Sequence, residues 1–315
     1  MARVSSLRAE LNCRMPATAD EFMEWAHRWL ETALRQLGTP LMEELEKSGP
    51  LSSAGLRDRS GLVPFGEPGS VWMSLVVGVA GGKGIRSSIS AWSPKDWEKF
   101  IARLRELPVE ASVKLSRLGV DGYPDVPALN VSVVRYPEQS DWMVLSCDGS
   151  TNRMAEVDDA QATRRLWVDL LRQNAARTEA AFGYLSDEAD YAGPRTALEA
   201  ALGLFPEETL GLLDRQLRGY SWITVAPPGV VDLLGGAEAL VKSGAFREVV
   251  SLSSGSVWLR AADDLPDYDG DRQRMVFETL AKALPPGQPR RDRRAHHRRL
   301  VYEDAAEYSA GVDGR

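Results

Sequence analysis

The sequence of 315 residues has few of the side chains that usually build metal or disulfide frameworks. It contains two cysteines, Cys13 and Cys147, and three histidines. So few cysteines in a chain of this length favour a reducing compartment and provide no disulfide scaffold. With only three histidines, a histidine-based metal site or a catalytic triad has few side chains from which it could be built. We therefore expect no cofactor, no metal and a cytoplasmic location.

Long apolar runs are also missing. No stretch approaches the ~18 uninterrupted apolar residues that a transmembrane helix needs, and residues 1–16 lack the apolar centre of a signal peptide. Hydrophobic residues make up 43% and charged residues 26% of the chain, which is the balance of an ordinary globular protein. This balance excludes extensive disorder and collagen-like or coiled-coil repeats, and we expect no membrane partner.

Negative charge exceeds positive charge, and the excess is uneven. The formal net charge is −7, but seven arginines and five acids fall in 290–315, so residues 1–289, with 31 basic and 40 acidic side chains, carry −9. An acidic body repels nucleic acid and suits a basic partner surface. The basic run RRDRRAHHRR at 290–299 could contact phosphate, although a solvated tail is the expected state after the proline-rich segment 285–289.

Apolar periodicity in the first half predicts alternating helices and strands. Residues 18–37 form one helical stripe that begins with a capping-box pattern, Thr18 and Glu21. Residues 71–79 are apolar on both faces and predict a buried central strand, and AGGKG at 80–84 predicts a hairpin turn. Further strands are expected at 85–92, 110–118, 128–135 and 141–147, and helices after Ser93 and at 159–178.

The second half follows a similar order of elements. Strands are expected at 182–185, 220–226, 246–252 and 255–261, and helices at 196–202, 206–217, 228–234, 235–244 and 271–284. The sequence therefore predicts an α+β fold, with helices packed on a largely antiparallel sheet in two halves related to the ferredoxin-like sandwich. We expect a first domain at 1–150, a second at 151–289 and a basic disordered tail at 290–315.

Acidic residues gather in the segment DDLPDYDGD, which spans 263–271. Asp267, Asp269 and Asp271 fit positions 1, 3 and 5 of a calcium loop, but Arg272 stands where that loop needs glycine. Acidic residues just before a helix also stabilise its N-terminus without any metal. The segment therefore favours an acidic helix start, with calcium binding and partner binding as alternatives.

A second acidic segment, SDEADY, covers 186–191 and places Asp187, Glu188 and Asp190 after a predicted strand. Two such carboxylates could act as acid and base on a small molecule. An enzyme of this kind would draw its pair from these three residues and from Asp263 and Asp264 in one pocket. No nucleophile or metal ligand lies near them in sequence, so no catalytic residue is assigned.

The nine tryptophans are mostly expected in the core. Trp142 and Trp258 differ, because they lie on strands whose other faces look half polar, and an aromatic side chain exposed on a sheet would be a binding anchor. The predicted partner-binding surface is thus the two acidic segments with one tryptophan: Asp187, Glu188, Asp190, Asp263, Asp264, Asp267, Asp269 and Trp258.

The C-terminal third also carries a resemblance to known families. Its segments are GYSWITVAPPGVVDLLGGAEAL, SGAFREVVSLSSGSVWLRA and DLPDYDGDRQRMVFETLAKALPP. This order is similar to uncharacterised actinobacterial proteins and to the immunity-like families of type VI secretion and polymorphic toxins. The shared motifs are structural, so no active-site residue follows from them. The resemblance implies a cytoplasmic protein that binds a cognate toxin and blocks it.

Three functions therefore compete. The first is a binding protein of the immunity type, which the acidic body suits because inhibitors of nucleases present carboxylates to a basic active site. The second is the carboxylate-pair enzyme. The third is a protein that contacts nucleic acid through the basic run at 290–299, and its binding should then weaken steeply with salt.

Overall fold

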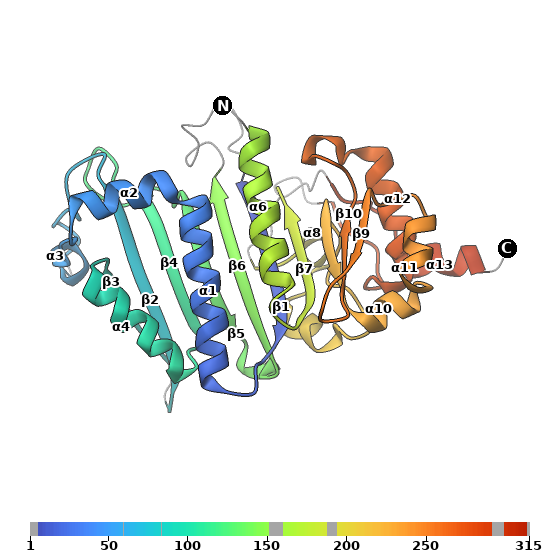
Figure 1. Cartoon of the computed structure of the whole chain (residues 1–315), viewed down its shortest axis with the longest axis horizontal. Helices are drawn as coiled ribbons and strands as arrows, with labels where there is room; N and C mark the ends of the chain where they lie inside the picture. The colour runs from blue at the N-terminus through green and yellow to red at the C-terminus, as the bar shows by residue number, and fades with distance from the viewer. Residues whose placement is uncertain are drawn as a thin grey trace. The chain divides into compact units, whose positions relative to one another are not determined.

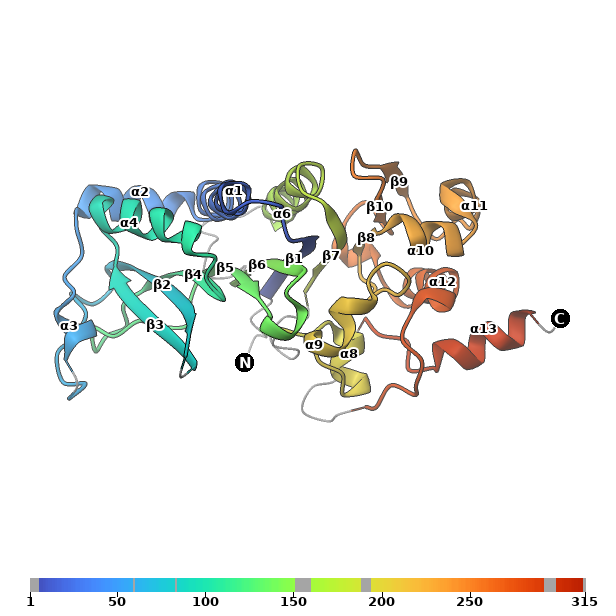
Figure 2. The ribbon, with the colours of Figure 1, turned by 90° about the horizontal axis from the view of Figure 1, so that it is seen from below.

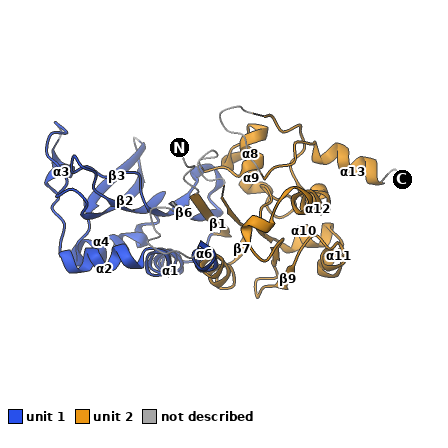
Figure 3. Ribbon diagram, turned by 90° about the horizontal axis from the view of Figure 1, so that it is seen from above, with its two compact units in different colours: residues 1–5, 15–166 blue, residues 6–14, 167–315 orange. Residues whose placement is uncertain are grey.

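The computed structural model describes residues 6–58, 60–82, 84–150, 160–187, 194–291 and 299–313. The chain divides into two compact units (Figure 3): unit 1 holds residues 1–5 and 15–166, and unit 2 holds residues 6–14 and 167–315. The expected boundary at residue 150 lies close to this division, but unit 2 also takes the segment 6–14 from the start of the chain. No helix in the described part is long and apolar enough to cross a membrane.

The strands described in unit 1 form an antiparallel sheet in the order β3-β2-β4-β5-β6 (Figure 1). One face of this sheet is covered by α1, α2 and α4 (Figure 2). The strands are β2 (Val71–Gly81), β3 (Gly84–Ala91), β4 (Glu110–Arg117), β5 (Leu129–Arg135) and β6 (Trp142–Ser150). The helices are α1 (Ala19–Leu37), α2 (Thr39–Ser48), α3 (Ala54–Arg57) and α4 (Pro94–Arg103).

Apolar side chains on alternate positions of these strands build the core of unit 1. Leu75 pairs with Val113, which pairs with Val131, and all three are buried. Leu115 and Leu129, one pair further along the same face, lie under Gly38 at the junction of α1 and α2. Helix α1 begins with the expected capping box, since Thr18 and Glu21 exchange hydrogen bonds of 3.2 Å. Its buried stripe packs on β5 and β6.

The strands described in unit 2 form a second antiparallel arrangement in the order β1-β7-β8-β10-β9. They are β1 (Ser6–Arg14), β7 (Ala180–Ser186), β8 (Ile223–Ala226), β9 (Glu248–Ser251) and β10 (Val257–Arg260). The helices are α6 (Ala160–Ala175), whose second half belongs to this unit, α8 (Ala197–Leu202), α9 (Pro206–Thr209), α10 (Pro228–Leu233), α11 (Gly236–Lys242), α12 (Gly270–Leu280) and α13 (Ala305–Asp313).

The structure confirms the α+β class and the antiparallel sheet, and it adds elements that the sequence did not predict. Strand β1 lies at 6–14, and helix α2 begins at Thr39, directly after Gly38 and with Pro40 in its first turn. Residues 206–217, expected as one helix, hold only α9 and a short 3-10 turn at Leu210–Leu212.

The C-terminal segment also differs from the expected disordered tail at 290–315. The backbone N–H of Val301 donates to the Tyr220 hydroxyl at 2.8 Å, and α13 follows at 305–313. Glu303 accepts two hydrogen bonds from Arg274, of 2.6 and 2.7 Å, and this ion pair lowers the pKa of Glu303. Residues 299–313 are therefore a folded part of unit 2, whereas 292–298 of the basic run lie outside the described residues.

Both cysteines are buried and neither is bridged. Burial raises the pKa of the Cys13 thiol to about 12, and its sulfur lies 3.4 Å from the Thr178 hydroxyl. Because a buried, protonated thiol is a poor nucleophile, we expect no reaction of the native protein with the thiol reagent DTNB over minutes. The same measurement after denaturation should count two thiols, and rapid labelling of the native protein would contradict the structure.

Candidate protein-binding surface

The two acidic segments predicted from the sequence meet at Arg299. This side chain forms an ion pair with Asp187, with distances of 2.9 and 3.2 Å, and also donates to the carbonyl oxygen of Tyr268. Asp187 follows β7, and Tyr268 lies within the segment 263–271. The structure thus brings one described acid of the first segment beside the second segment, but Arg299 neutralises its charge.

The acids of the second segment serve mostly local structure. Asp263 forms an exposed ion pair with Arg247 at 3.2 Å. Asp264 accepts from the backbone N–H of Leu265 at 2.9 Å and begins the 3-10 turn at 265–267, and Asp269 stands just before α12. Asp264 therefore has the helix-start role that acidic residues often have, whereas Asp269 makes no side-chain hydrogen bond to the start of α12. Asp267 lies within the same 3-10 turn.

Trp258 is not a surface anchor. Its side chain is 0% exposed, and its indole N–H donates to Glu248 at 3.2 Å. The guanidinium of Arg172 lies 5.7 Å from the centre of its ring. Trp142 is also buried, with 2% of its surface exposed. The prediction that Trp258 is part of an exposed partner-binding surface is therefore wrong, because its ring is buried beside Arg172 and Glu248.

The carboxylate pair that the enzyme hypothesis needs is not gathered in the described residues. Asp187 and Asp263 each face an arginine, Asp264 begins a 3-10 turn, and none of the three lines a cavity described below. Glu188 and Asp190 lie outside the described residues. No cluster of metal-ligating side chains occurs in the parts of the chain that the structure describes. The calcium loop is interrupted because α12 already begins at Gly270.

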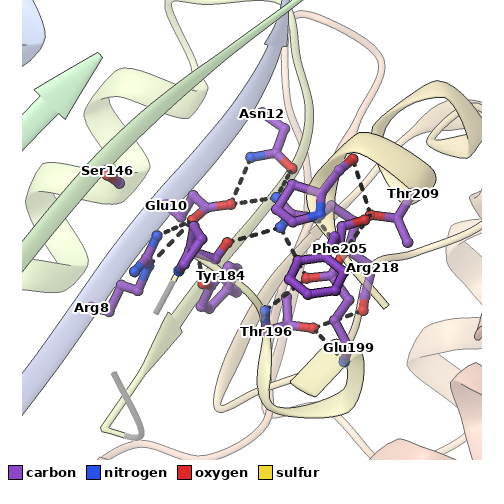
Figure 4. Close-up of polar contacts among 12 residues, drawn as sticks. Arg8, Glu10, Asn12, Ser146, Tyr184, Thr196, Glu199, Phe205, Thr209 and Arg218 are labelled. Carbon is purple, nitrogen blue, oxygen red and sulfur yellow. Dashed lines mark hydrogen bonds and ion pairs between the residues drawn. The ribbon is translucent and has the colours of Figure 1, made fainter. Parts of the chain in front are cut away.

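Unit 2 contains a buried network of charged side chains that sequence analysis missed (Figure 4). Arg218 donates two hydrogen bonds to Glu199, of 2.7 and 2.9 Å, and contacts Glu10 at 2.5 Å and Asn12 at 2.7 Å. Arg8 binds the other oxygen of Glu10 at 2.7 Å. Glu10 and Glu199 are 0% exposed and Arg218 is 1% exposed.

The two arginines and two glutamates of this network balance in charge. Burial alone would raise the pKa of Glu10, but the charges of Arg218 and Arg8 outweigh burial and lower it. Burial raises the pKa of Tyr184, whose hydroxyl lies 3.3 Å from Glu10. Every charge thus has an opposite partner, and none of these side chains lines a described cavity. We assign the network to the folding of unit 2 rather than to chemistry.

The largest described cavity is a groove of about 720 Å³ in unit 1, which we call the α1–α2–α4 groove. Its volume is within the range of ligand pockets. Met73 of β2 and Trp92, which precedes α4, form a buried floor together with Leu34 of α1. Met42 of α2 and Trp97 of α4 are half-buried and extend the apolar surface toward solvent.

Carboxylates surround this apolar floor. Glu31 comes from α1, Glu43 and Glu46 come from α2, and Glu98 comes from α4. Arg35 is the single basic lining residue, so the lining carries a net charge of −3. Two consecutive helices, α1 and α2, and a third from later in the chain, α4, thus present negative charge around one apolar hollow.

The rim carboxylates differ in how far the chain neutralises them. Glu31 forms an ion pair with Arg35 at 2.7 Å, and Glu43 has only a loose contact with Lys47 at 3.9 Å. Glu46 and Glu98 have no ion-pair partner among the described residues, and both are exposed. They are therefore free to interact with a basic partner, unlike Asp187 in unit 2.

The sequence held one signal of this groove, although not enough to predict it. Residues 39–48 place Met42 beside Glu43 and Glu46, which is the pattern of an amphipathic helix. Seeing that this helix and two others enclose one hollow requires the packing of α2 and α4 on β2 and of α1 on β5 and β6. The two acidic segments, 186–191 and 263–271, were easier to recognise than the groove, because their carboxylates lie within a few residues of one another in the sequence.

Comparisons with known proteins add a likeness of fold. No family model and no curated protein matches the chain. Among solved structures, the Pseudomonas aeruginosa T6SS protein PA0821 matches with a TM-score of 0.50 and 12% sequence identity, over 97% of this chain and 82% of that one. The chain therefore shares the fold of a type VI secretion system protein. This likeness is one of fold and covers nearly the whole chain; it does not extend to the actinobacterial or immunity-like families expected from the sequence of the C-terminal third.

Proposed function

We propose that this chain is a non-catalytic binding protein that blocks a basic partner, as an immunity protein blocks its cognate toxin, and that it acts in the cytoplasm. The observation that carries the proposal is the α1–α2–α4 groove, where an apolar floor is surrounded by four carboxylates, two of which, Glu46 and Glu98, have no ion-pair partner among the described residues. An apolar centre with a charged rim is the usual anatomy of a protein interface.

Two further observations support the proposal. The fold is shared with a type VI secretion system protein, and the resemblance of the C-terminal third to immunity-like families implies a protein that blocks a toxin. That step is an analogy, since a fold does not determine a function. The net charge of −7 supplies the complementarity that speeds association with a basic partner.

Capture of the partner from a lysate of the native cell tests this function. At about 0.05 M NaCl we expect the chain to retain one basic protein at stoichiometric amounts, and at about 0.5 M NaCl we expect most of it to dissociate, because salt screens charge attraction. Expression of the captured protein alone should stop growth, and co-expression of this chain should restore it. Mass spectrometry and a growth curve provide the two measurements.

Either of two results would contradict the proposal. One is that the chain retains no protein at either salt concentration, and the other is that the retained protein is harmless when expressed alone. In the first case, turnover of a small molecule becomes the hypothesis to test, with Glu188 and Asp190 as the acids to substitute first.

A further inference from the structure

We propose that the α1–α2–α4 groove binds a cationic amphipathic helix of the partner protein. This inference rests on the proposed function and specifies the part of the partner that is recognised. It follows from three properties of the groove: the chemistry of its floor, the charge of its rim and the hydrogen bonding of the strand beneath it.

The floor selects apolar side chains. Trp92 and Met73 are buried under the groove, and Trp97 stands at its side with one ring stacked on Phe100 at a centroid distance of 5.5 Å. Methionine and tryptophan provide an adaptable, polarisable surface that suits leucine-like or aromatic anchors. Trp97 also lines a second cavity of about 330 Å³ together with Met23 and Ile101, so the apolar surface continues beyond it.

The rim selects basic side chains. Glu46 of α2 and Glu98 of α4 lie on different helices that line the same groove. A lysine or arginine beside an apolar anchor could rest its aliphatic stem on the floor and extend its charge to these carboxylates. An acidic or neutral segment would instead leave the rim charges unmatched or repelled.

The strand under the groove excludes binding by strand addition. β2 pairs with β3 on one side and with β4 on the other, and the carbonyl of Met73 already accepts from the N–H of Trp92 at 2.9 Å. The floor therefore offers no free row of backbone groups to an extended peptide. An occupant that buries its backbone here must satisfy its own hydrogen bonds, as a helix does.

A defined peptide tests the groove without knowledge of the partner. The probe is a fluorescein-labelled amphipathic helix of about 14 residues, or four turns, made of leucine and lysine. One control peptide replaces lysine with glutamate, and another scrambles the order so that no apolar face forms. Binding is measured by fluorescence anisotropy, and we expect only the leucine–lysine helix to bind the wild-type chain.

Matched variants locate the binding. The double variant Glu46→Lys/Glu98→Lys should weaken binding by about tenfold or more, and Trp97→Ala should do the same. The control Glu138→Lys/Glu238→Lys makes the same change of net charge at exposed residues that do not line the groove, and should have little effect. Circular dichroism confirms that each variant is folded.

Three results would overturn the inference. The first is no binding of the leucine–lysine helix, and the second is equal weakening by both double variants, which would mean general attraction to an acidic protein. A rim variant that changes the oligomeric state in size-exclusion chromatography would overturn it too, because the groove would then hold a second copy.

Lysate capture with the same variants separates this inference from the proposed function. If both double variants retain the partner equally, the groove is not its site but the function stands; if the peptide binds the groove and no partner is captured, the function fails alone.

Discussion

Replacing Arg218 with methionine is expected to lower the free energy of unfolding by about 3–5 kcal/mol, the usual cost of removing one partner from a buried ion pair. Arg218 donates to both Glu10 and Glu199, which are fully buried. The variant would leave Glu199 without its only ion-pair partner among the described residues, although Thr196 and Thr209 still donate to it. Urea unfolding followed by circular dichroism measures the change.

The pH dependence distinguishes this loss from a simple loss of packing. In the wild type, the pKa of Glu10 is lowered, so its contribution to stability is present above the unfolded-state pKa of about 4.3 and is lost as the pH falls through the folded-state pKa. In the variant Glu10 loses the largest of the charges that lower its pKa, so it should take up a proton at a higher pH than in the wild type. The difference in stability between the two proteins should therefore shrink as the pH falls from neutral toward the unfolded-state pKa of Glu10.

Two further variants control for the identity and the position of the charge. Arg218→Lys keeps a positive charge but loses the planar fork, and should be intermediate. Arg247→Met removes an exposed partner of Asp263, and should cost less than about 1 kcal/mol. If Arg218→Met and Arg247→Met were equally stable, the buried network would not hold unit 2 together.

Replacing Trp29 with alanine should destabilise unit 1 by a similar amount, about 3–5 kcal/mol. Trp29 lies on α1, is 0% exposed, and donates from its indole N–H to the carbonyl oxygen of Ser146 at 3.1 Å. The variant loses a large apolar side chain, opens a cavity against β6 and removes this hydrogen bond. The free energy of unfolding in urea is again the measurement.

Trp25 supplies the matched control, because it lies one turn earlier on the same helix and is only half-buried. Trp25→Ala should cost clearly less than Trp29→Ala, since part of its surface already faces water. Equal losses from the two substitutions would show that the stability of unit 1 does not depend on the packing of α1 against the sheet. Trp29→Phe, which keeps most of the volume, should fall between the two.

Much of the fold was predictable because it follows from short-range patterns. The capping box at Thr18, the doubly apolar strand at 71–79 and the hairpin turn at 80–84 each depend on residues close in sequence, and the structure contains all three. The acidic helix start in 263–271 was predictable for the same reason, because Asp264 caps the 3-10 turn at 265–267 and Asp271 lies in the first turn of α12. Neither feature needs a partner distant in sequence.

The burial of both faces of strand β1 could not be predicted from the sequence, although its apolar and polar residues alternate regularly. Leu7, Ala9, Leu11 and Cys13 are apolar and separated by polar residues, which suggests one buried and one solvated face. In the structure both faces are buried, because Arg218 approaches Glu10 from 208 positions along the chain. A partner at that separation leaves no trace in local sequence. The groove in unit 1 escaped prediction for the same reason, since three helices contribute to it.

The position of β1 has a consequence for synthesis. β1 is made first, but its partner β7 follows after about 165 residues, as the contact between Cys13 and Thr178 shows. At about 5–20 residues per second, the ribosome needs roughly ten to thirty seconds to complete that interval. All of unit 1 except its first five residues is translated in between. β1 therefore precedes its partner β7 by the whole of that interval, during which the other unit can fold, and unit 2 closes only when the second half of the chain returns to it.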